Sequence, residues 1–149
     1  MKGDKQTAEY TYAQNQLIPV GASAIFNNTI PCNRGLIYHR DESSVFVLKG
    51  AVNNPCQGFA RYQITFNGNI SVPEGETAGP ISISLALGGE SIATSNAIVT
   101  PTVAEAFFNV TSTMFADIPA GTSLTLSVEN TSTIPIDMNA ANLTISRVA

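Results

Sequence analysis

The sequence predicts an all-β protein, a sandwich or barrel of about nine or ten short strands. Apolar residues alternate with small polar ones, as in Ile81, Ile83 and Leu85 against Ser82 and Ser84, and this period of two places one face of a strand in a core. Clusters rich in glycine, proline, serine and asparagine separate the alternating runs. No stretch has the apolar stripe of an amphipathic helix.

The same alternation identifies the remaining strands along the chain. It is strongest at Tyr62, Ile64 and Phe66, and it returns at Leu143 and Ile145. Residues that favour strands, the β-branched and aromatic ones, are concentrated in these runs. The expected strands lie near residues 17–20, 23–27, 35–39, 44–49, 59–71, 79–87, 91–99, 104–115, 121–129 and 141–148.

Turn-forming clusters indicate where the later strands end. Residues 72–80, 87–90, 118–123 and 129–135 each combine glycine, proline or short polar side chains at a point where the backbone must reverse. The polar residues 1–16 precede the first expected strand. We therefore expect an N-terminal arm over residues 1–16 and one domain over residues 17–149.

The composition excludes several classes of partner. Charged residues make up only 12% of the chain, about half the usual fraction, and the net charge is −4. Nucleic-acid binding needs clustered lysine or arginine, and the seven basic residues are scattered. No apolar run approaches the about 18 residues of a membrane span, and the N-terminus lacks the apolar run of a signal peptide.

The segment "GLIYHRDESSVFVLKG", from Gly35 to Gly50, contains the single histidine and allows two interpretations. In one, His39 is a general base oriented by Asp41 or Glu42, with Ser43 or Ser44 as nucleophile. Residues so close on one turn do not converge as a nucleophile, base and acid must. The favoured interpretation is a hairpin, in which "RDESS" joins two strands.

No cofactor or catalytic motif is present, so we expect a protein that is not an enzyme. One histidine and two cysteines that form no CxxC pair do not provide a zinc site, and the glycine-rich phosphate loops are absent. Calcium held by loop oxygens stays open as an alternative, although such carboxylates are usually solvated. Its candidate ligands are Asp41, Glu42, Glu74 and Glu76.

The two cysteines flank the expected hairpin. Cys32 and Cys56 both lie in turn-like contexts, so folding could bring them to disulfide distance. A disulfide would imply assembly or residence outside the reducing cytosol, whereas free thiols would act as small apolar groups. Both alternatives stay open.

The order of the strands resembles the jelly-roll domain shared by complement-type globular heads and the tumour necrosis factor family. Bacterial and phage versions are the most similar, including the C-terminal domains of collagen-like spore-surface glycoproteins. The resemblance extends from about Leu17 to the C-terminus. It is carried by "LIPVGASAIFN", "GLIYHRDESSVFVLKG", "FARYQITFNGNI", "GPISISLALGGESI", "GTSLTLSVENTS" and "ANLTISRVA".

The resemblance implies a two-sheet antiparallel jelly-roll sandwich of about ten strands, assembled as a threefold homotrimer. The strands at 59–71 and 121–129 combine one apolar face with one polar, hydrogen-bonding face, which suits a partly hydrated protomer interface. The candidate interface residues on these polar faces are Arg61, Gln63, Thr65, Thr125 and Ser127.

The resemblance also suggests a function. No Gly-x-y collagen repeat precedes the jelly roll, and a self-contained module of this kind is similar to the capsid decoration and head-fibre proteins of phage or prophage virions. Such a structural module would sit on the virion surface and attach to a capsid lattice by its arm. The candidate attachment residues are Lys2, Asp4, Lys5, Tyr10 and Tyr12.

The alternative is a recognition module at an extracellular or cell surface, which binds a glycan or a host-surface protein, or a spore-surface trimer. Glycan sites commonly use an aromatic ring, and this chain has no tryptophan and few aromatic residues in its expected loops. The structural module is therefore the favoured hypothesis.

Overall fold

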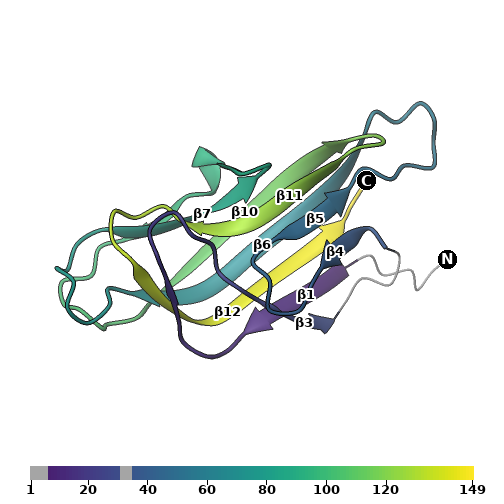
Figure 1. The fold of residues 1–149 in the computed structure, drawn as a ribbon. Coiled ribbons are helices and arrows are strands. Elements are labelled where there is room, and N and C mark those ends of the chain that lie inside the picture. Colours follow the sequence, from purple (N-terminus) through teal and green to yellow (C-terminus); the bar gives the residue numbers. More distant parts are fainter. Residues whose placement is uncertain (1–6, 31–34) are drawn as a thin grey trace.

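The computed structural model describes residues 7–30 and 35–149, and it shows two antiparallel sheets packed face to face (Figure 1). Sheet A runs in the order β10-β6-β12-β1-β3, and β2 also pairs with β12. Its strands are β1 (Thr7–Tyr12), β2 (Gln16–Ile18), β3 (Asn27–Ile30), β6 (Phe59–Ser71), β10 (Phe108–Pro119) and β12 (Ile136–Arg147). The predicted all-β sandwich is confirmed.

Sheet B runs in the order β4-β5-β11-β7-β8, and β9 also pairs with β7. Its strands are β4 (Ile37–His39), β5 (Phe46–Lys49), β7 (Ile81–Leu87), β8 (Glu90–Ser91), β9 (Ala97–Val99) and β11 (Ser123–Asn130). A single 3-10 turn, η1 (Ala93–Ser95), separates β8 from β9. The expected strand at 91–99 is therefore wrong, because the turn divides this segment into two short strands.

The core lies between the sheets and follows the alternation of the sequence. Tyr62, Ile64 and Phe66 of β6 point inward and are fully buried, while the residues between them face outward. The phenol of Tyr62 donates to the carbonyl oxygens of Leu36 and Lys49, at 3.2 and 2.6 Å. This polar atom is therefore satisfied within the core, as a buried tyrosine requires.

The last strand is longer than its alternation predicted. β12 begins at Ile136, and its pairing with β6 shifts in register between Asn139 and Asn142. Ala140 lies at this bulge with φ of 51°. One extra residue reverses which side chains point inward, so Met138 is buried before the bulge and Leu143 after it. The sequence pattern therefore breaks in the middle of one strand, and the expected strand at 141–148 is only its second half.

The first strand lies within the segment expected to form an N-terminal arm. β1 (Thr7–Tyr12) lies between β12 and β3, and both Ala8 and Tyr10 belong to the core, with Tyr10 only 2% exposed. Tyr12 packs against the same core. Residues 7–12 are therefore part of the sandwich, and the assignment of attachment residues stays a prediction. The other three candidates, Lys2, Asp4 and Lys5, lie outside the described residues.

An aromatic cluster joins β1 to the β4–β5 hairpin. The His39 ring stacks on Phe46 with centroids 4.1 Å apart, and Tyr10 meets both rings edge-on. His39 Nδ1 lies 2.6 Å from Asn28 Oδ1, and Nε2 lies 2.8 Å from the carbonyl oxygen of Ser43. Burial lowers the pKa of His39, and the carbonyl of Ser43 and the nearby Asp41, which favour the protonated ring, oppose this effect only in part.

We predict that Tyr10→Ala lowers the free energy of unfolding by about 3–5 kcal/mol, because it leaves a cavity where β1 meets the aromatic cluster. The matched control is Thr11→Ala, which removes one exposed hydroxyl contact with Thr29 and costs below about 1 kcal/mol. Urea unfolding measures both changes. Equal effects of the two substitutions would show that β1 is not part of the core.

We predict an acid-sensitive stability that depends on His39. Burial lowers its pKa below the ordinary value of 6.5, so the unfolded chain takes up this proton more readily than the folded protein. The contribution of the neutral His39 to stability is fully present above about pH 6.5, and it decreases as the pH falls through 6.5 toward the lower pKa of the folded state. The free energy of unfolding, measured with denaturant, should therefore decrease less between pH 7.5 and pH 5 in His39→Gln than in the natural sequence. Parallel curves for the two proteins would contradict this assignment.

Candidate interaction surfaces

The outer face of sheet A is covered with hydroxyl and amide side chains, which we call the polar face. Thr113, Thr65 and Thr144 lie in one row across β10, β6 and β12, and Glu9 of β1 continues it. A second row contains Thr111, Asn67, Asn142 and Thr11.

These side chains bond to one another across the strands of the polar face. Thr111 Oγ1 donates to Asn67 Oδ1 at 2.9 Å, and Asn109 Nδ2 donates to the same oxygen at 3.0 Å. At the other side of the face, the hydroxyls of Thr7 and Ser146 lie 2.9 Å apart. Cross-strand hydrogen bonds of this kind hold the side chains in fixed positions, so the polar face is an ordered surface.

The structure brings together three of the five predicted interface residues. Arg61, Gln63 and Thr65 follow one another along the outer side of β6, on the polar face. Thr125 and Ser127 lie on the outer side of β11, in sheet B. The predicted set is therefore divided between opposite faces of the sandwich, and one flat contact does not include all five residues.

An ion pair ends the polar face on one side. Arg61 Nε and Nη2 donate to the two carboxylate oxygens of Asp117 at 2.7 and 3.1 Å. This pairing lowers the pKa of Asp117 and raises that of Arg61. Both side chains are exposed, so the pair adds little to stability and instead fixes the position of Arg61.

Aromatic side chains lie beside this pair at the edge of sheet A. β10 is the terminal strand of the sheet, so one side of its backbone has no neighbour in sheet A. Phe115 of β10 is 61% exposed and lies opposite Gln63, and Phe59 is exposed beneath the guanidinium of Arg61. A long strand edge therefore adjoins exposed aromatic surface, a combination typical of protein interfaces.

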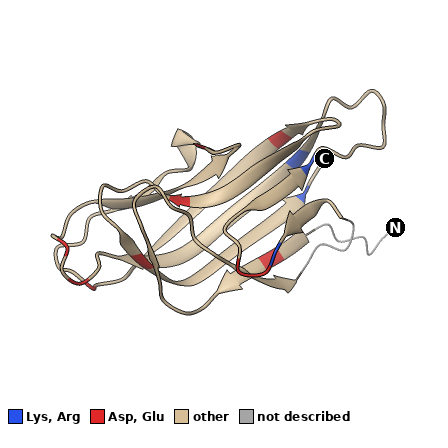
Figure 2. Ribbon diagram, in the orientation of Figure 1, with Lys and Arg blue, Asp and Glu red and all other residues tan. Residues whose placement is uncertain are grey.

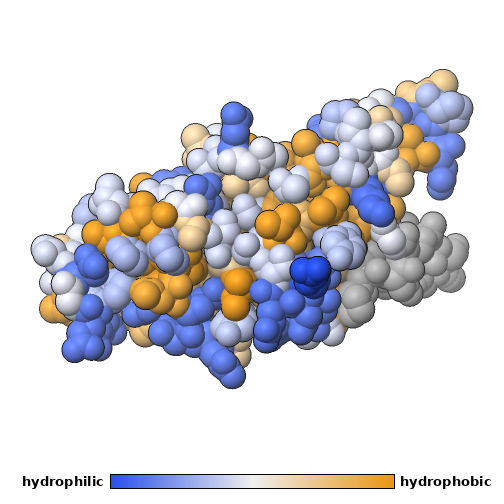
Figure 3. All heavy atoms as spheres, viewed as in Figure 1, coloured by the Kyte–Doolittle hydropathy of each residue, from blue (hydrophilic) through white to orange (hydrophobic). Residues whose placement is uncertain are grey.

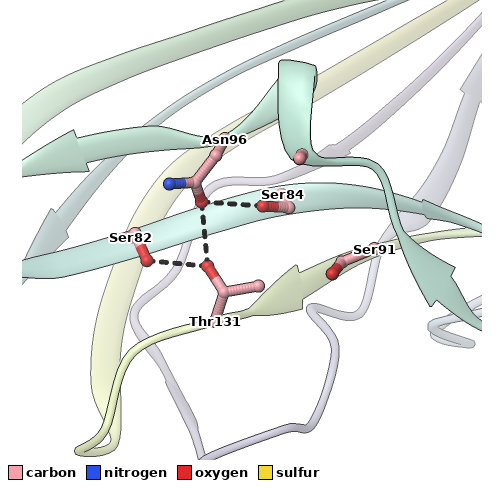
Figure 4. Close-up of a pocket in the computed structure, with 6 residues that line it drawn as sticks. Ser82, Ser84, Ser91, Asn96 and Thr131 are labelled. Atoms are coloured by element: carbon pink, nitrogen blue, oxygen red, sulfur yellow. Dashed lines mark hydrogen bonds between the residues drawn. The ribbon is translucent and has the colours of Figure 1, made fainter.

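A small polar pocket lies on the outer face of sheet B (Figure 4). β7 forms its floor, with Ser82 and Ser84 both buried, and the segment after η1 brings Asn96 over this floor. The hollow measures about 270 Å³. Its lining residues are Ser82, Ser84, Ser91, Ala93, Asn96 and Thr131.

Hydrogen bonds between the lining residues order the pocket. Ser84 Oγ donates to Asn96 Oδ1 at 2.7 Å, and Thr131 Oγ1 donates to the same atom at 3.0 Å. The hydroxyls of Ser82 and Thr131 lie 2.7 Å apart. Sequence analysis identified the serines only as the outer side of a strand. Asn96 and Thr131 come from separate loops, and the only sequence signal for them is their place in clusters of polar residues.

The histidine segment forms a hairpin, as expected. β4 pairs with β5, and the turn between them contains Arg40 to Val45. Both ring nitrogens of His39 are engaged, one with Asn28 and one with Ser43, so neither faces a hydroxyl nucleophile. Asp41, one of the two acids considered for orienting the histidine, instead accepts a hydrogen bond from the backbone N–H of Asn28 at 2.8 Å. These contacts give the segment a structural role.

Other predicted sites receive less support. Within residues 7–30 and 35–149, no three histidine, cysteine or acidic side chains lie close enough to hold a metal ion. Cys56 is exposed, and its possible partner Cys32 lies outside the described residues, so the disulfide stays a prediction. The part of the chain that the structure describes contains no helix suited to crossing a membrane.

Charge and hydrophobicity are distributed unevenly over the surface. Figure 2 shows few charged residues along the strands, and blue segments near the C-terminus as well as beside the acidic β4–β5 turn. Among the described basic residues, Lys49, Arg61 and Arg147 lie near strand ends, and Arg40 lies in that turn. On the face shown in Figure 3, hydrophobic residues form separate patches between hydrophilic ones. The surface is therefore mainly neutral and hydrogen-bonding.

Comparison with known proteins identifies the fold. No protein-family model and no curated protein sequence matches the chain. Among solved structures, Eiger TNF from S. frugiperda is similar with a TM-score of 0.70 and 10% identity, over 98% of this chain and 94% of that one. Murine APRIL at pH 5.0 is similar with a TM-score of 0.64 and 8% identity, over 95% of this chain and 99% of that one.

A third similar structure is the globular domain of the zebrafish complement 1qA protein, with a TM-score of 0.60, 10% identity, and coverage of 97% of this chain and 96% of that one. All three similarities extend over nearly the whole of both chains. The chain therefore has the two-sheet jelly-roll fold of tumour necrosis factor and complement C1q domains.

Proposed function

We propose that the protein is a non-enzymatic module that assembles as a homotrimer through sheet A. The observation that carries this proposal is the combination of two different surfaces on one sheet. The polar face is broad and ordered, its charged side chains Arg61 and Asp117 are paired with each other, and the adjoining β10 edge exposes Phe115. Together they provide the polar area and the aromatic anchor of a protein interface.

The two surfaces suit a cyclic assembly. An edge and a face are different patches, so one protomer would place its β10 edge against the polar face of the next. Contacts of this head-to-tail kind close into a ring when the rotation allows it. Ring closure would also cover the β10 edge of every protomer, which otherwise remains available for pairing with any exposed strand. Threefold symmetry comes from the resemblance to complement-type and tumour necrosis factor domains.

The finer assignment is to a capsid decoration or head-fibre protein of a phage virion, with a spore or cell-surface trimer as the alternative. The sequence resemblance alone supports it. Since β1 takes Tyr10 and Tyr12 into sheet A, attachment to a particle would use the loops or the residues before Thr7. Co-sedimentation with the parent particle tests this assignment.

We predict that Thr65→Lys breaks the trimer and that Thr125→Lys does not. Both threonines face outward from the middle of a strand, but Thr65 lies on the polar face and Thr125 lies on sheet B. A lysine buried in each interface loses its hydration without gaining a partner, so the first substitution should shift the mass from about three times 15.7 kDa toward 15.7 kDa. Light scattering at micromolar concentration measures the mass.

The opposite pattern, with dissociation caused only by Thr125→Lys, would place the interface on sheet B. A monomer formed by the natural sequence itself would contradict the proposed assembly. Far-UV circular dichroism of both variants provides the control for folding, because each lysine is exposed in the monomer and should leave its secondary structure unchanged.

A further inference from the structure

We propose that the pocket on β7 binds a neutral ligand with several hydroxyl groups, of the size of a single sugar ring. This inference goes beyond the proposed trimer, because the pocket lies on sheet B and the polar face lies on sheet A. The argument depends on which hydrogen-bonding groups the pocket has already used and which it leaves for a ligand.

The hydroxyl groups of Ser82, Ser84 and Thr131 form a hydrogen-bonded chain that ends at Asn96 Oδ1. Thr131 Oγ1 gives its only proton to Asn96 Oδ1, so the 2.7 Å contact between Ser82 and Thr131 requires Ser82 to be the donor. Ser84 gives its proton to Asn96 Oδ1 as well. The direction of donation is therefore fixed from Ser82 through Thr131 to Asn96, and from Ser84 to Asn96.

This arrangement determines what the pocket offers to a ligand. The hydroxyl protons of Ser82 and Ser84 are already used in hydrogen bonds within the cluster, so toward a ligand their oxygen atoms act as acceptors. The amide of Asn96 receives both bonds at Oδ1, and its nitrogen points away from the cluster with two N–H donors (Figure 4). The pocket thus places acceptors on its floor and a donor group at its rim.

Adjacent hydroxyl groups of one molecule match this pattern, because each hydroxyl both donates and accepts. One ligand hydroxyl would donate to the floor serines, and a neighbouring one would accept from the Asn96 amide. The six lining residues carry no formal charge, so they offer no partner to an ionic ligand. Glu129 lies in register with Ser84 on the next strand and disfavours an anion.

The shape of the site is compatible with one ring. A second hollow of about 220 Å³ adjoins the first and shares Ser82 and Thr131 with it. There Ile98, which is 61% exposed, and Pro80 provide an aliphatic surface for the C–H groups of a ligand. No aromatic ring lines either hollow, so we expect weak binding, with a Kd of about 1–10 mM.

The floor of the pocket is formed before a ligand arrives. β7 pairs with β11 on one side and with β8 and β9 on the other, so the backbone beneath Ser82 and Ser84 is held by strands on both sides. The β7–β8 turn uses Gly88 and Gly89, both with positive φ, which suits a two-residue hairpin. A preformed site avoids the entropy cost of ordering a loop on binding.

The test is a titration of the full ¹⁵N-labelled chain, followed by NMR. The probes are the methyl glycosides of glucose, galactose and mannose, with glucuronate as the charged comparison. At least one neutral glycoside should shift the Asn96 side-chain amide signals saturably, with a Kd of about 1–10 mM. Glucuronate should bind more weakly than that glycoside, because its carboxylate meets no cationic partner and lies near Glu129.

Two variants and a matched control assign the binding to the pocket. Asn96→Ala and Thr131→Val should each weaken the binding at least about tenfold, because each removes a hydrogen-bonding group from the cluster. Thr125→Val lies on the same face of sheet B outside the pocket and should bind as the natural sequence does. Far-UV circular dichroism confirms that each variant is folded.

Three outcomes would overturn the proposal. They are the absence of a saturable shift with every neutral glycoside up to about 50 mM, unchanged binding by Asn96→Ala, and tighter binding of glucuronate than of every neutral glycoside. None of these outcomes concerns the oligomeric state, so failure of this proposal and failure of the trimer are measured separately.

Discussion

The structure depends on one constraint, that the long strands of sheet A must bury one side and expose the other. β6 satisfies it from Phe59 to Ile70, with Tyr62, Ile64 and Phe66 in the core. The outer side must then tolerate both solvent and close neighbours, and in this chain it is filled mainly by threonine, serine and asparagine. Such side chains bond across strands without needing an ionic partner, which explains how a domain with so few charges keeps an ordered surface.

Much of the fold could be predicted because alternation is a local property. The strand at residues 59–71 has the predicted bounds. Errors occur where local pattern and tertiary context disagree. The bulge at Ala140 shifts the alternation of buried residues by one position within β12. The sequence pattern therefore predicted only the second half of this strand. In β1, Ala8 and Tyr10 do alternate with polar residues, but the segment is short and its surroundings are polar, and only its pairing with β12 and β3 shows that it belongs to the sheet.

The candidate surfaces were less predictable, because they depend on strand order. Arg61, Gln63 and Thr65 share one strand, so alternation alone was sufficient to place them on one face. The sequence pattern does not reveal that β11 lies in sheet B. This placement separates Thr125 and Ser127 from the three residues of β6. The pocket is even harder to predict from the sequence. Asn96 and Thr131 are brought together across β7, and no local pattern relates two residues that lie so far apart in the chain.

The place of β12 has a consequence for how the chain is made. β12 lies between β6 and β1, and it follows all the other described strands in chain order. Until β12 has been made, β1 and β6 each lack the neighbour that joins them, and both present an unpaired edge. Sheet A is therefore completed only once β12 has left the ribosome. A messenger RNA with a stop codon shortly before Ile136 would yield a chain with two open edges, prone to aggregate with other chains made from the same message.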